Sequence, residues 1–323
     1  MAELPDPEPA PGWVRVRTTV AALCMTDFEV LDGSFDLDFP LVAGHEWSGI
    51  VDRAGSVEDE RSIGCRVTGD NEISCLKCHY CRSGQWRCCP EYKQIGFEAP
   101  GAYAEYLLVP SQNLHVLPES VSFEQGALVE PLGVGLAVAA MAEAAPGSTA
   151  IVLGAGPIGL NCMAALKASG ARRILCLDRR LQRCARASAW GAYSVYQDIA
   201  TLRAAAARLH PRGTDIIVEA AGSEELLEAA IAMAPFGGTV VLAGYLGDRR
   251  MAMTPDHIQI RNLKVLGAGN NVRFNLRALE SVGDGVISTE SMITHRFSLD
   301  DFSEAFSRES VERPDYVKGI FEF

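Results

Sequence analysis

Four cysteines close to residue 80 have the spacing of metal ligands. They are Cys75, Cys78, Cys81 and Cys89, in the pattern C-x2-C-x2-C-x7-C. Four thiolates with this spacing can enclose one Zn²⁺ tetrahedrally and leave no open position, so the site that they predict is structural. An iron–sulfur cluster and chance clustering of thiols are the weaker alternatives. Cys88 could replace Cys89 as the fourth ligand, but the x7 spacing favours Cys89.

A second, open metal site has four candidate ligands that lie far apart in the sequence. Cys24 begins a C-M-T-D sequence, His45 and Glu46 stand in G-H-E, and Glu130 precedes a proline. A catalytic zinc ion needs about three protein ligands and one position for water or substrate. Taken singly, each residue is equally consistent with a buried thiol, a hydrogen-bonded histidine or a carboxylate at the start of a helix.

A glycine-rich motif predicts a nucleotide site. The pattern G-x-G-x-x-G directly follows the apolar run 150–153 and precedes a predicted helix that continues through 160–169. In this context the glycines allow the backbone to approach a pyrophosphate at the start of the helix. The alternative is a glycine-rich turn that binds no nucleotide. The motif residues are Gly154, Gly156, Pro157, Ile158 and Gly159.

The choice between NAD and NADP depends on the end of the next predicted strand. Asp178 lies 19 residues after the last glycine of the motif. Its carboxylate would accept hydrogen bonds from the adenosine ribose and repel a 2′-phosphate, which favours NAD. Arg179, Arg180 and Arg183 argue in the other direction, because guanidinium groups can bind a phosphate. We therefore expect NAD, with NADP as the alternative.

The elements that must position these residues show two patterns. Alternating apolar residues predict strands at 13–20 and 49–52 in the first third of the chain. After Glu130, Ala-rich helical segments alternate with short apolar runs, which predicts a doubly wound parallel α/β sheet. The runs are 150–153, 173–177, 215–218, 239–243 and 264–266, and further strands are expected at 294–299 and 316–323. We expect a catalytic domain over 1–130 with a metal lobe at 70–92, a nucleotide domain over 131–268, and a return to the catalytic domain over 269–323.

Composition restricts the class of protein. The 323 residues are 48% hydrophobic and 22% charged, as in globular proteins. A net charge of −12 disfavours nucleic acid as a partner, and apolar runs of strand length disfavour a membrane span. Without a recognisable secretory signal, we expect a cytoplasmic protein whose remaining thiols are reduced and buried. The thiols expected in the core are Cys65, Cys162, Cys176 and Cys184.

These motifs, in this order, resemble those of the zinc-containing medium-chain dehydrogenases over nearly the whole chain. The resemblance implies a Rossmann domain joined to a GroES-like catalytic domain, and Glu130-Pro resembles the polyol, sorbitol and threonine dehydrogenase branch. It implies that Cys24, His45 and Glu46 bind a catalytic zinc ion, and that Glu130 either binds it or anchors its water. It also implies a small polar alcohol as substrate and a homodimer or homotetramer.

The resemblance assigns further roles. Thr26 would hydrogen-bond the substrate hydroxyl, and Asp27 would orient His45, since ligating imidazoles usually donate their second N–H to an acceptor. Ala221, Gly244 and Gly267 would approach the cofactor at the ends of later strands.

Two departures from the family pattern accompany the resemblance. Glu29 stands where many relatives have a histidine that relays the proton, so the relay would pass through this carboxylate or through water. The strand pair that usually precedes the P-D-P-E-P segment is missing, so we expect an exposed or re-paired sheet edge.

The substrate class has three interpretations. The G-H-E-W-S-G sequence together with Glu29 is similar to dehydrogenases of aminocyclitol and antibiotic biosynthesis, such as 2-deoxy-scyllo-inosamine dehydrogenases. A threonine-type or sorbitol-type dehydrogenase is the alternative among enzymes. A protein that binds a nucleotide but is not an enzyme, with a structural or sensor role, is the other alternative. The candidate ligands of an open metal site argue against it.

Overall fold

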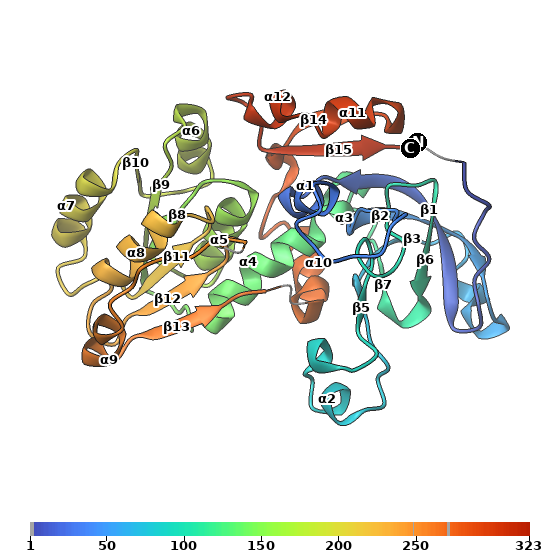
Figure 1. Cartoon of the computed structure of the whole chain (residues 1–323), viewed down its shortest axis with the longest axis horizontal. Coiled ribbons are helices and arrows are strands. Elements are labelled where there is room, and N and C mark those ends of the chain that lie inside the picture. Colours follow the sequence, from blue (N-terminus) through green and yellow to red (C-terminus); the bar gives the residue numbers. More distant parts are fainter. Residues whose placement is uncertain (1–2, 248, 270–271) are drawn as a thin grey trace. The chain divides into compact units, whose positions relative to one another are not determined.

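The computed structural model describes residues 3–247, 249–269 and 272–323, which divide into two compact units (Figure 1). Unit 1 comprises Met1–Glu130 and Asn275–Phe323, and unit 2 comprises Pro131–Phe274. The second boundary thus follows Phe274 rather than residue 268, and the short 3-10 helix η4 (Val272–Phe274), with its buried Val272, is the last element of unit 2.

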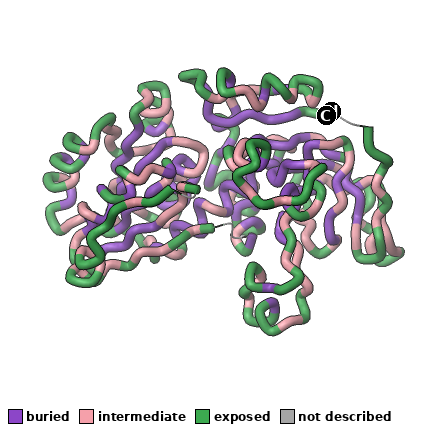
Figure 2. The backbone as a smooth tube through the Cα atoms, viewed as in Figure 1, coloured by how far each residue is buried: buried purple, intermediate pink, exposed green. Residues whose placement is uncertain are grey.

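Unit 2 is built on a six-stranded parallel sheet in the order β10-β9-β8-β11-β12-β13. Its strands are short apolar runs that are almost entirely buried at the centre of the sheet, as Figure 2 shows. They are β8 (Thr149–Leu153), β9 (Arg173–Leu177), β10 (Ser194–Tyr196), β11 (Ile216–Glu219), β12 (Thr239–Leu242) and β13 (Lys264–Gly267). The order reverses between β8 and β11, which is where doubly wound sheets bind their ligands.

Helices cover both faces of this sheet. On one face, Ile151 and Leu153 of β8 share a core with residues of α7 and α8, whereas Val152 points to the opposite face, towards α5. The predicted doubly wound α/β fold is therefore confirmed. The helices are α4 (Val129–Met141), which begins at the end of unit 1, α5 (Pro157–Ala168), α6 (Leu181–Ala189), α7 (Ile199–Leu209), α8 (Glu224–Met233) and α9 (Asp256–Arg261).

Unit 1 contains a seven-stranded sheet in which the first strand is central. The strands follow the order β14-β15-β1-β2-β3-β7, and β6 pairs with β1 as well. They are β1 (Trp13–Ala22), β2 (Glu46–Ala54), β3 (Arg66–Gly69), β6 (Tyr106–Pro110), β7 (Leu114–Val116), β14 (Ile293–Phe297) and β15 (Lys318–Glu322). The strand from the end of the chain is therefore an integral part of the N-terminal sheet.

Both edges of β1 are paired. One edge bonds to β2, and the other bonds first to β6 and then, from Val20 to Ala22, to β15. β6 pairs with β1 alone among the described strands. This strand ends at Pro110, which has no N–H to donate to a further strand.

Short helices connect the strands of this unit. The α-helices are α1 (Met25–Leu31), α3 (Phe123–Ala127), α10 (Asn275–Gly283), α11 (Phe302–Ala305) and α12 (Arg308–Glu312). The 3-10 helices are η1 (Val57–Ser62), η3 (Ser111–Asn113), η5 (Glu290–Met292) and η6 (Leu299–Asp301). Trp47, Tyr103 and Phe321 are among the large side chains of the core beneath them.

A small lobe leaves unit 1 between two paired strands. The antiparallel strands β4 (Glu72–Ile73) and β5 (Lys93–Gln94) form its neck, and α2 (His79–Arg82) and η2 (Trp86–Cys88) lie beyond them. Figure 1 shows the lobe projecting from the rest of its unit, and Figure 2 shows that little of it is buried. Its side chains therefore provide little apolar core.

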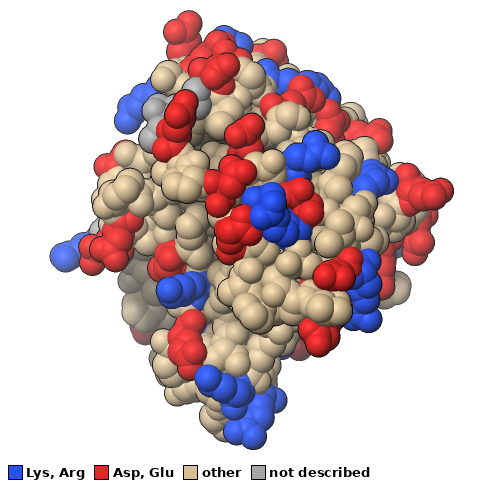
Figure 3. Space-filling model, turned by 90° about the vertical axis from the view of Figure 1, so that its right-hand side faces the viewer, with Lys and Arg blue, Asp and Glu red and all other residues tan. Residues whose placement is uncertain are grey.

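The surface carries charges of both signs. Figure 3 shows acidic side chains dispersed over one face, with Lys and Arg among them. In the described part of the chain, no helix has both the length and the apolar character to cross a membrane.

Candidate active site

Pairing of β1 with β2 brings the first candidate ligands together. Ala22 lies opposite Glu46 in this antiparallel pair, so Cys24, just beyond the end of β1, lies beside His45, just before β2. One ligand atom from each of Cys24, His45 and Glu46 lies within 4.8 Å of the others. His45 and Glu46 are buried, and Cys24 is partly exposed. This group of three is called the triad below.

Asp27 fixes the orientation of the histidine. Its carboxylate is fully buried, lies 3.1 Å from Nδ1 of His45 and accepts a hydrogen bond from the backbone N–H of Cys24 at 2.9 Å. Burial opposes ionisation of Asp27, but His45 lowers the pKa of Asp27 below its usual value. Burial likewise opposes protonation of His45, but Asp27 raises the pKa of His45 well above its usual value. With Nδ1–H directed to Asp27, Nε2 is the nitrogen that would release its proton and bind a metal.

Tyr103 completes this arrangement, and the sequence reading missed it. Its hydroxyl donates to Asp27 and lies 3.1 Å from the carbonyl oxygen of Ala22. The tyrosine ring also explains the glycine of G-H-E, because a Cβ on Gly44 would lie 2.7 Å from the ring, and its φ is +97°. Thus Gly44 admits the tyrosine that anchors the Asp27 carboxylate.

Glu46 forms an ion pair with a residue from the end of the chain. Nζ of Lys318 lies 2.6 Å from Oε1 of Glu46, and both side chains are buried. Burial opposes protonation of the lysine, but the charge of Glu46 raises the pKa of Lys318 above its usual value. The sequence reading did not find Lys318; the only signal was a single lysine inside the apolar strand V-K-G-I-F.

Glu130 lies near the triad but outside the group of ligand atoms within 4.8 Å. It stands in the first turn of α4, is 8% exposed and accepts a hydrogen bond from Nδ2 of Asn71 at 3.3 Å. Burial raises the pKa of Glu130 to about 7, with opposing contributions from His45 and Lys318. Asn71, also fully buried, is another site residue that sequence reasoning missed.

Thr26 lies at the start of α1, next to the triad. Its hydroxyl Oγ1 is 3.5 Å from Sγ of Cys24. A hydroxyl at this position can reach a group bound beside the thiolate and can pass a proton onward. The donor set of one thiolate, one imidazole and one carboxylate suits Zn²⁺ and leaves a position open.

The four cysteines of the lobe also converge. Sulfur atoms of Cys75, Cys78, Cys81 and Cys89 all lie within 4.8 Å of one another, whereas Cys88 is exposed and outside the group. Backbone N–H groups, that of Lys77 foremost, lower the pKa of Cys75 to about 7. Burial raises the pKa of Cys81 to about 11, and a bound cation would favour its deprotonation. This set of soft ligands in a lobe without a core fits a structural zinc ion.

The remaining predicted core thiols divide by depth. Cys162 and Cys176 are fully buried in unit 2, and burial raises the pKa of both. Cys65 and Cys184 are only partly buried, which corrects their expected placement in the core. Cys65 follows the exposed helix η1, and Cys184 lies on α6 with its Sγ 3.0 Å from the carbonyl oxygen of Asp178.

The glycine-rich loop of unit 2 connects β8 to α5. Gly156 caps this helix and Pro157, followed by Ile158, is its first residue, an arrangement that directs free backbone N–H groups outward. A Cβ on Gly159 would lie 1.9 Å from the carbonyl oxygen of Gly154, so no other residue fits there. The loop begins at the switch point of the sheet, where dinucleotides bind.

Asp178 lies directly beside this loop. One carboxylate oxygen accepts the backbone N–H of Ala155 and the other that of Arg180, both at 2.9 Å. Nη1 of Arg183 is 3.9 Å from the carboxylate, whereas Arg179 is exposed. The negative charge expected at the end of β9 is therefore present, with one of the competing arginines close enough to pair with it.

The other expected cofactor residues stand at the same edge of the sheet. Ala221 follows β11, Gly244 follows β12, and Gly267 ends β13. Because the strands are parallel, their carboxyl ends share this edge with the glycine-rich loop.

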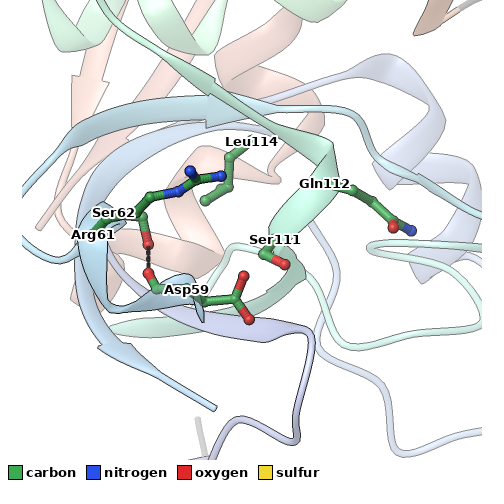
Figure 4. Close-up of a pocket in the computed structure, with 6 residues that line it drawn as sticks. All are labelled: Asp59, Arg61, Ser62, Ser111, Gln112 and Leu114. Carbon is green, nitrogen blue, oxygen red and sulfur yellow. Dashed lines mark hydrogen bonds between the residues drawn. The ribbon is translucent and has the colours of Figure 1, made fainter. Parts of the chain in front are cut away.

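A further pocket lies on the surface of unit 1, between η1 and η3 (Figure 4). Its lining residues are Asp59, Arg61, Ser62, Ser111, Gln112 and Leu114. Ser62 donates a hydrogen bond to the carbonyl oxygen of Asp59 at 2.6 Å, and Ser56 lowers the pKa of the Asp59 carboxyl. No residue predicted to do chemistry lines this pocket.

Known proteins share both units. An alcohol dehydrogenase GroES-like domain matches residues 10–119, and a glucose dehydrogenase C-terminus matches residues 123–323. Sorbitol dehydrogenase of Arabidopsis thaliana is 32% identical over 319 residues, which cover 95% of this chain and 85% of the relative.

Solved structures agree with these matches. One, described as a zinc-binding dehydrogenase from Sinorhizobium meliloti 1021 bound to NADP, is 33% identical with a TM-score of 0.92, over 98% of this chain and 94% of the other. An alcohol dehydrogenase from Escherichia coli CFT073, complexed with NADH, is 26% identical with a TM-score of 0.91, over 98% and 94%.

A Rossmann unit with its glycine-rich loop, together with a GroES-like unit that carries two candidate metal sites, defines a zinc-dependent oxidoreductase. The chain belongs to the zinc-containing medium-chain dehydrogenases and is an alcohol or polyol dehydrogenase. The resemblance seen in the sequence is therefore confirmed at the level of family and enzyme class.

Proposed function

We propose that this enzyme oxidises a secondary hydroxyl group of a small polyol or cyclitol to a ketone, with NAD as the hydride acceptor. The observation that carries the proposal is the convergence of Cys24, His45 and Glu46 within 4.8 Å, with the buried Glu130 close by. A polyol is favoured because the Arabidopsis relative is named for sorbitol.

The metal assignment follows from the two groups of ligands. We propose one zinc ion on Cys24, His45 and Glu46, with Glu130 nearby, and a second on the cysteines of the lobe. Zinc at the triad would act as a Lewis acid towards the alcohol oxygen, and the nicotinamide ring would accept the hydride. Cys24 and Glu46 contribute two negative charges against Zn²⁺, which favours its binding in a buried site.

The chain's own residues would position the alcohol and move its proton. The Thr26 hydroxyl, 3.5 Å from Sγ of Cys24, would accept the hydroxyl proton and pass it towards solvent, while Asp27 and Tyr103 hold His45 in one orientation. The carbon-bound hydrogen leaves with its electron pair for the cofactor, and the oxygen keeps the electrons of the broken O–H bond, so a ketone results.

NAD is preferred on the basis of Asp178. Its carboxylate lies beside the loop expected to hold the pyrophosphate, and Arg183 lies 3.9 Å from it, so part of the arginine charge is balanced. A 2′-phosphate would therefore meet a negative charge. Among the solved structures similar to this chain, one holds NADP and another NADH, so the cofactor needs a direct test.

The experiment is a panel of alcohols assayed with NAD and with NADP, read as absorbance of the reduced cofactor. Sorbitol, xylitol, inositols, an aminocyclitol, L-threonine and primary alcohols form the panel. Turnover of a polyol or cyclitol with NAD is the expected result. Preference for L-threonine or for a primary alcohol contradicts the substrate class, and faster turnover with NADP contradicts the cofactor.

Metal analysis and size measurement accompany the assay. We expect two zinc ions per chain, one of them lost in a Cys24→Ser variant and the other in a Cys78→Ser variant. One zinc ion or none in the intact protein contradicts the assignment. We also expect a homodimer or homotetramer, which light scattering measures directly.

A further inference from the structure

The buried ion pair of Lys318 and Glu46 joins the end of the chain to the triad. Nζ lies 2.6 Å from Oε1, and the side chains are only 3% and 1% exposed. Pairing of β15 with β1 places Ile320 opposite Ala22, so Lys318 at the start of β15 is directed to the same end of the sheet as Cys24 and Glu46. The contact is thus fixed by strand register.

A buried ion pair of this kind needs a reason beyond stability. Removing two charges from water costs several kcal/mol for each ion, and apolar residues of similar volume often stabilise a fold equally well. The pair also lies inside a candidate metal site, where a cation close to the ligands works against metal binding. A role in orienting the Glu46 carboxylate for a metal would explain why this ion pair is present, whereas a contribution to stability does not.

The two oxygens of Glu46 have different environments. Oε1 receives the Lys318 ammonium group, whereas Oε2 is buried and has no hydrogen-bond partner among the described residues. Such an unpaired buried oxygen is costly unless something binds it. Only Oε2 is therefore available to a metal.

We propose that Lys318 is a positioning residue that restricts Glu46 to binding the metal through a single oxygen. The inference rests on the proposed function, because it requires a metal at the triad. A free carboxylate can bind a metal through one oxygen or both. With Oε1 held by the lysine, the second coordination position that Glu46 could occupy stays open for the alcohol oxygen.

The central variant is Lys318→Met, which removes the ammonium group and keeps an apolar side chain of similar length. We expect Glu46 to bind through both oxygens in this variant, so that the alcohol must displace one of them. The value of kcat/KM should fall on the order of 10- to 100-fold, mainly through KM, as is usual when a group that orients a metal ligand is removed. Lys318→Arg keeps the charge and the hydrogen bond, and should restore most of the activity.

The readout that separates positioning from a merely structural role is the visible spectrum of the cobalt(II)-substituted protein. A His45→Ala variant supplies the background from cobalt in the cysteine lobe. After subtraction, the unaltered protein should show the intense bands of four-coordinate cobalt, and Lys318→Met the weaker bands of a higher coordination number. An unchanged spectrum in folded Lys318→Met overturns the inference. Absence of any triad cobalt in the unaltered protein overturns the proposed function as well, so the two failures are distinct.

A double variant tests whether Lys318 acts through Glu46. This test does not require that the Lys318→Met single variant fold. Glu46→Gln with Lys318→Met leaves no unpaired charge at this position. We expect its kcat/KM to be no lower than that of Glu46→Gln alone, because Lys318 supports the metal only through the carboxylate and its unpaired charge would otherwise oppose the metal. A further tenfold loss of kcat/KM on adding Lys318→Met would show that the lysine acts elsewhere and would refute the proposal.

Discussion

Glu130 should make the stability of the protein depend on pH when the triad holds no metal. Burial, the largest cause, raises the pKa of its carboxyl from 4.5 to about 7. At about 1.4 kcal/mol for each pH unit, this difference is worth about 3 kcal/mol. The folded protein binds this proton more tightly than the unfolded chain does. The contribution is therefore complete below the unfolded pKa and is lost as pH rises through about 7.

The measurement is denaturant unfolding of protein that keeps zinc in the lobe but not at the triad, at several pH values from about 5 to about 8. The matched variant is Glu130→Gln, which has nearly the same shape and cannot ionise. The free energy of unfolding of the unaltered protein, relative to Glu130→Gln, should fall by about 2.5 kcal/mol across this range, because part of the contribution is already lost at pH 5. When the triad is saturated with zinc, most of this decrease in the free energy of unfolding should disappear, because a nearby cation favours the ionised carboxylate of Glu130.

A control variant tests whether removing any carboxylate changes the dependence of stability on pH. Glu119→Gln changes an exposed glutamate of the same unit and should leave the pH profile as it was. If the profiles of the unaltered protein and Glu130→Gln run parallel, Glu130 ionises as an ordinary surface residue does. The reasoning from burial would then be wrong, and so would the place of Glu130 in this centre.

Three further predictions concern other residues. Asp178→Ala should weaken NAD binding and lower the ratio of kcat/KM for NAD to that for NADP; a higher ratio would contradict our interpretation of Asp178. Cys81→Ser should cost the protein one zinc ion and lower its Tm, and retention of both ions would rule out the lobe site. Burial lowers the pKa of His210, a residue that is 3% exposed, so as pH falls the imidazole is protonated in the unfolded chain before it is protonated in the folded protein. The free energy of unfolding should therefore decrease as pH falls below about 6.5, and less so in His210→Gln.

The sequence predicted the nucleotide unit well because its central strands are buried on both faces. Such strands, of which β8 and β11 are examples, appear as unbroken apolar runs that composition alone reveals. β10 was missed because it has only three residues, none fully buried, at the edge of the sheet. β6 was missed as well, since neither its length nor its alternation stands out.

The candidate site could be predicted only in part. Cys24, His45 and Glu46 stand in recognisable motifs, and the pairing of β1 with β2 brings them together. Asn71 and Lys318 carry no motif, and the lysine lies 272 positions from its partner. Contacts of this kind are set by strand register, which a single sequence specifies only weakly across such separations.

The discontinuity of unit 1 has a consequence for how the protein is made. During synthesis the ribosome releases residues 1–130, then all of unit 2, and only afterwards the segment that contains β15. Until that strand arrives, Val20–Ala22 of β1 are paired with β2 on one edge only, and Glu46 sits at a nascent triad without its lysine. Whereas unit 2 can fold as its chain emerges, the metal centre must wait until the segment after unit 2 has been translated. A nascent chain arrested before residue 318 would thus present zinc ligands in an open, unfinished sheet.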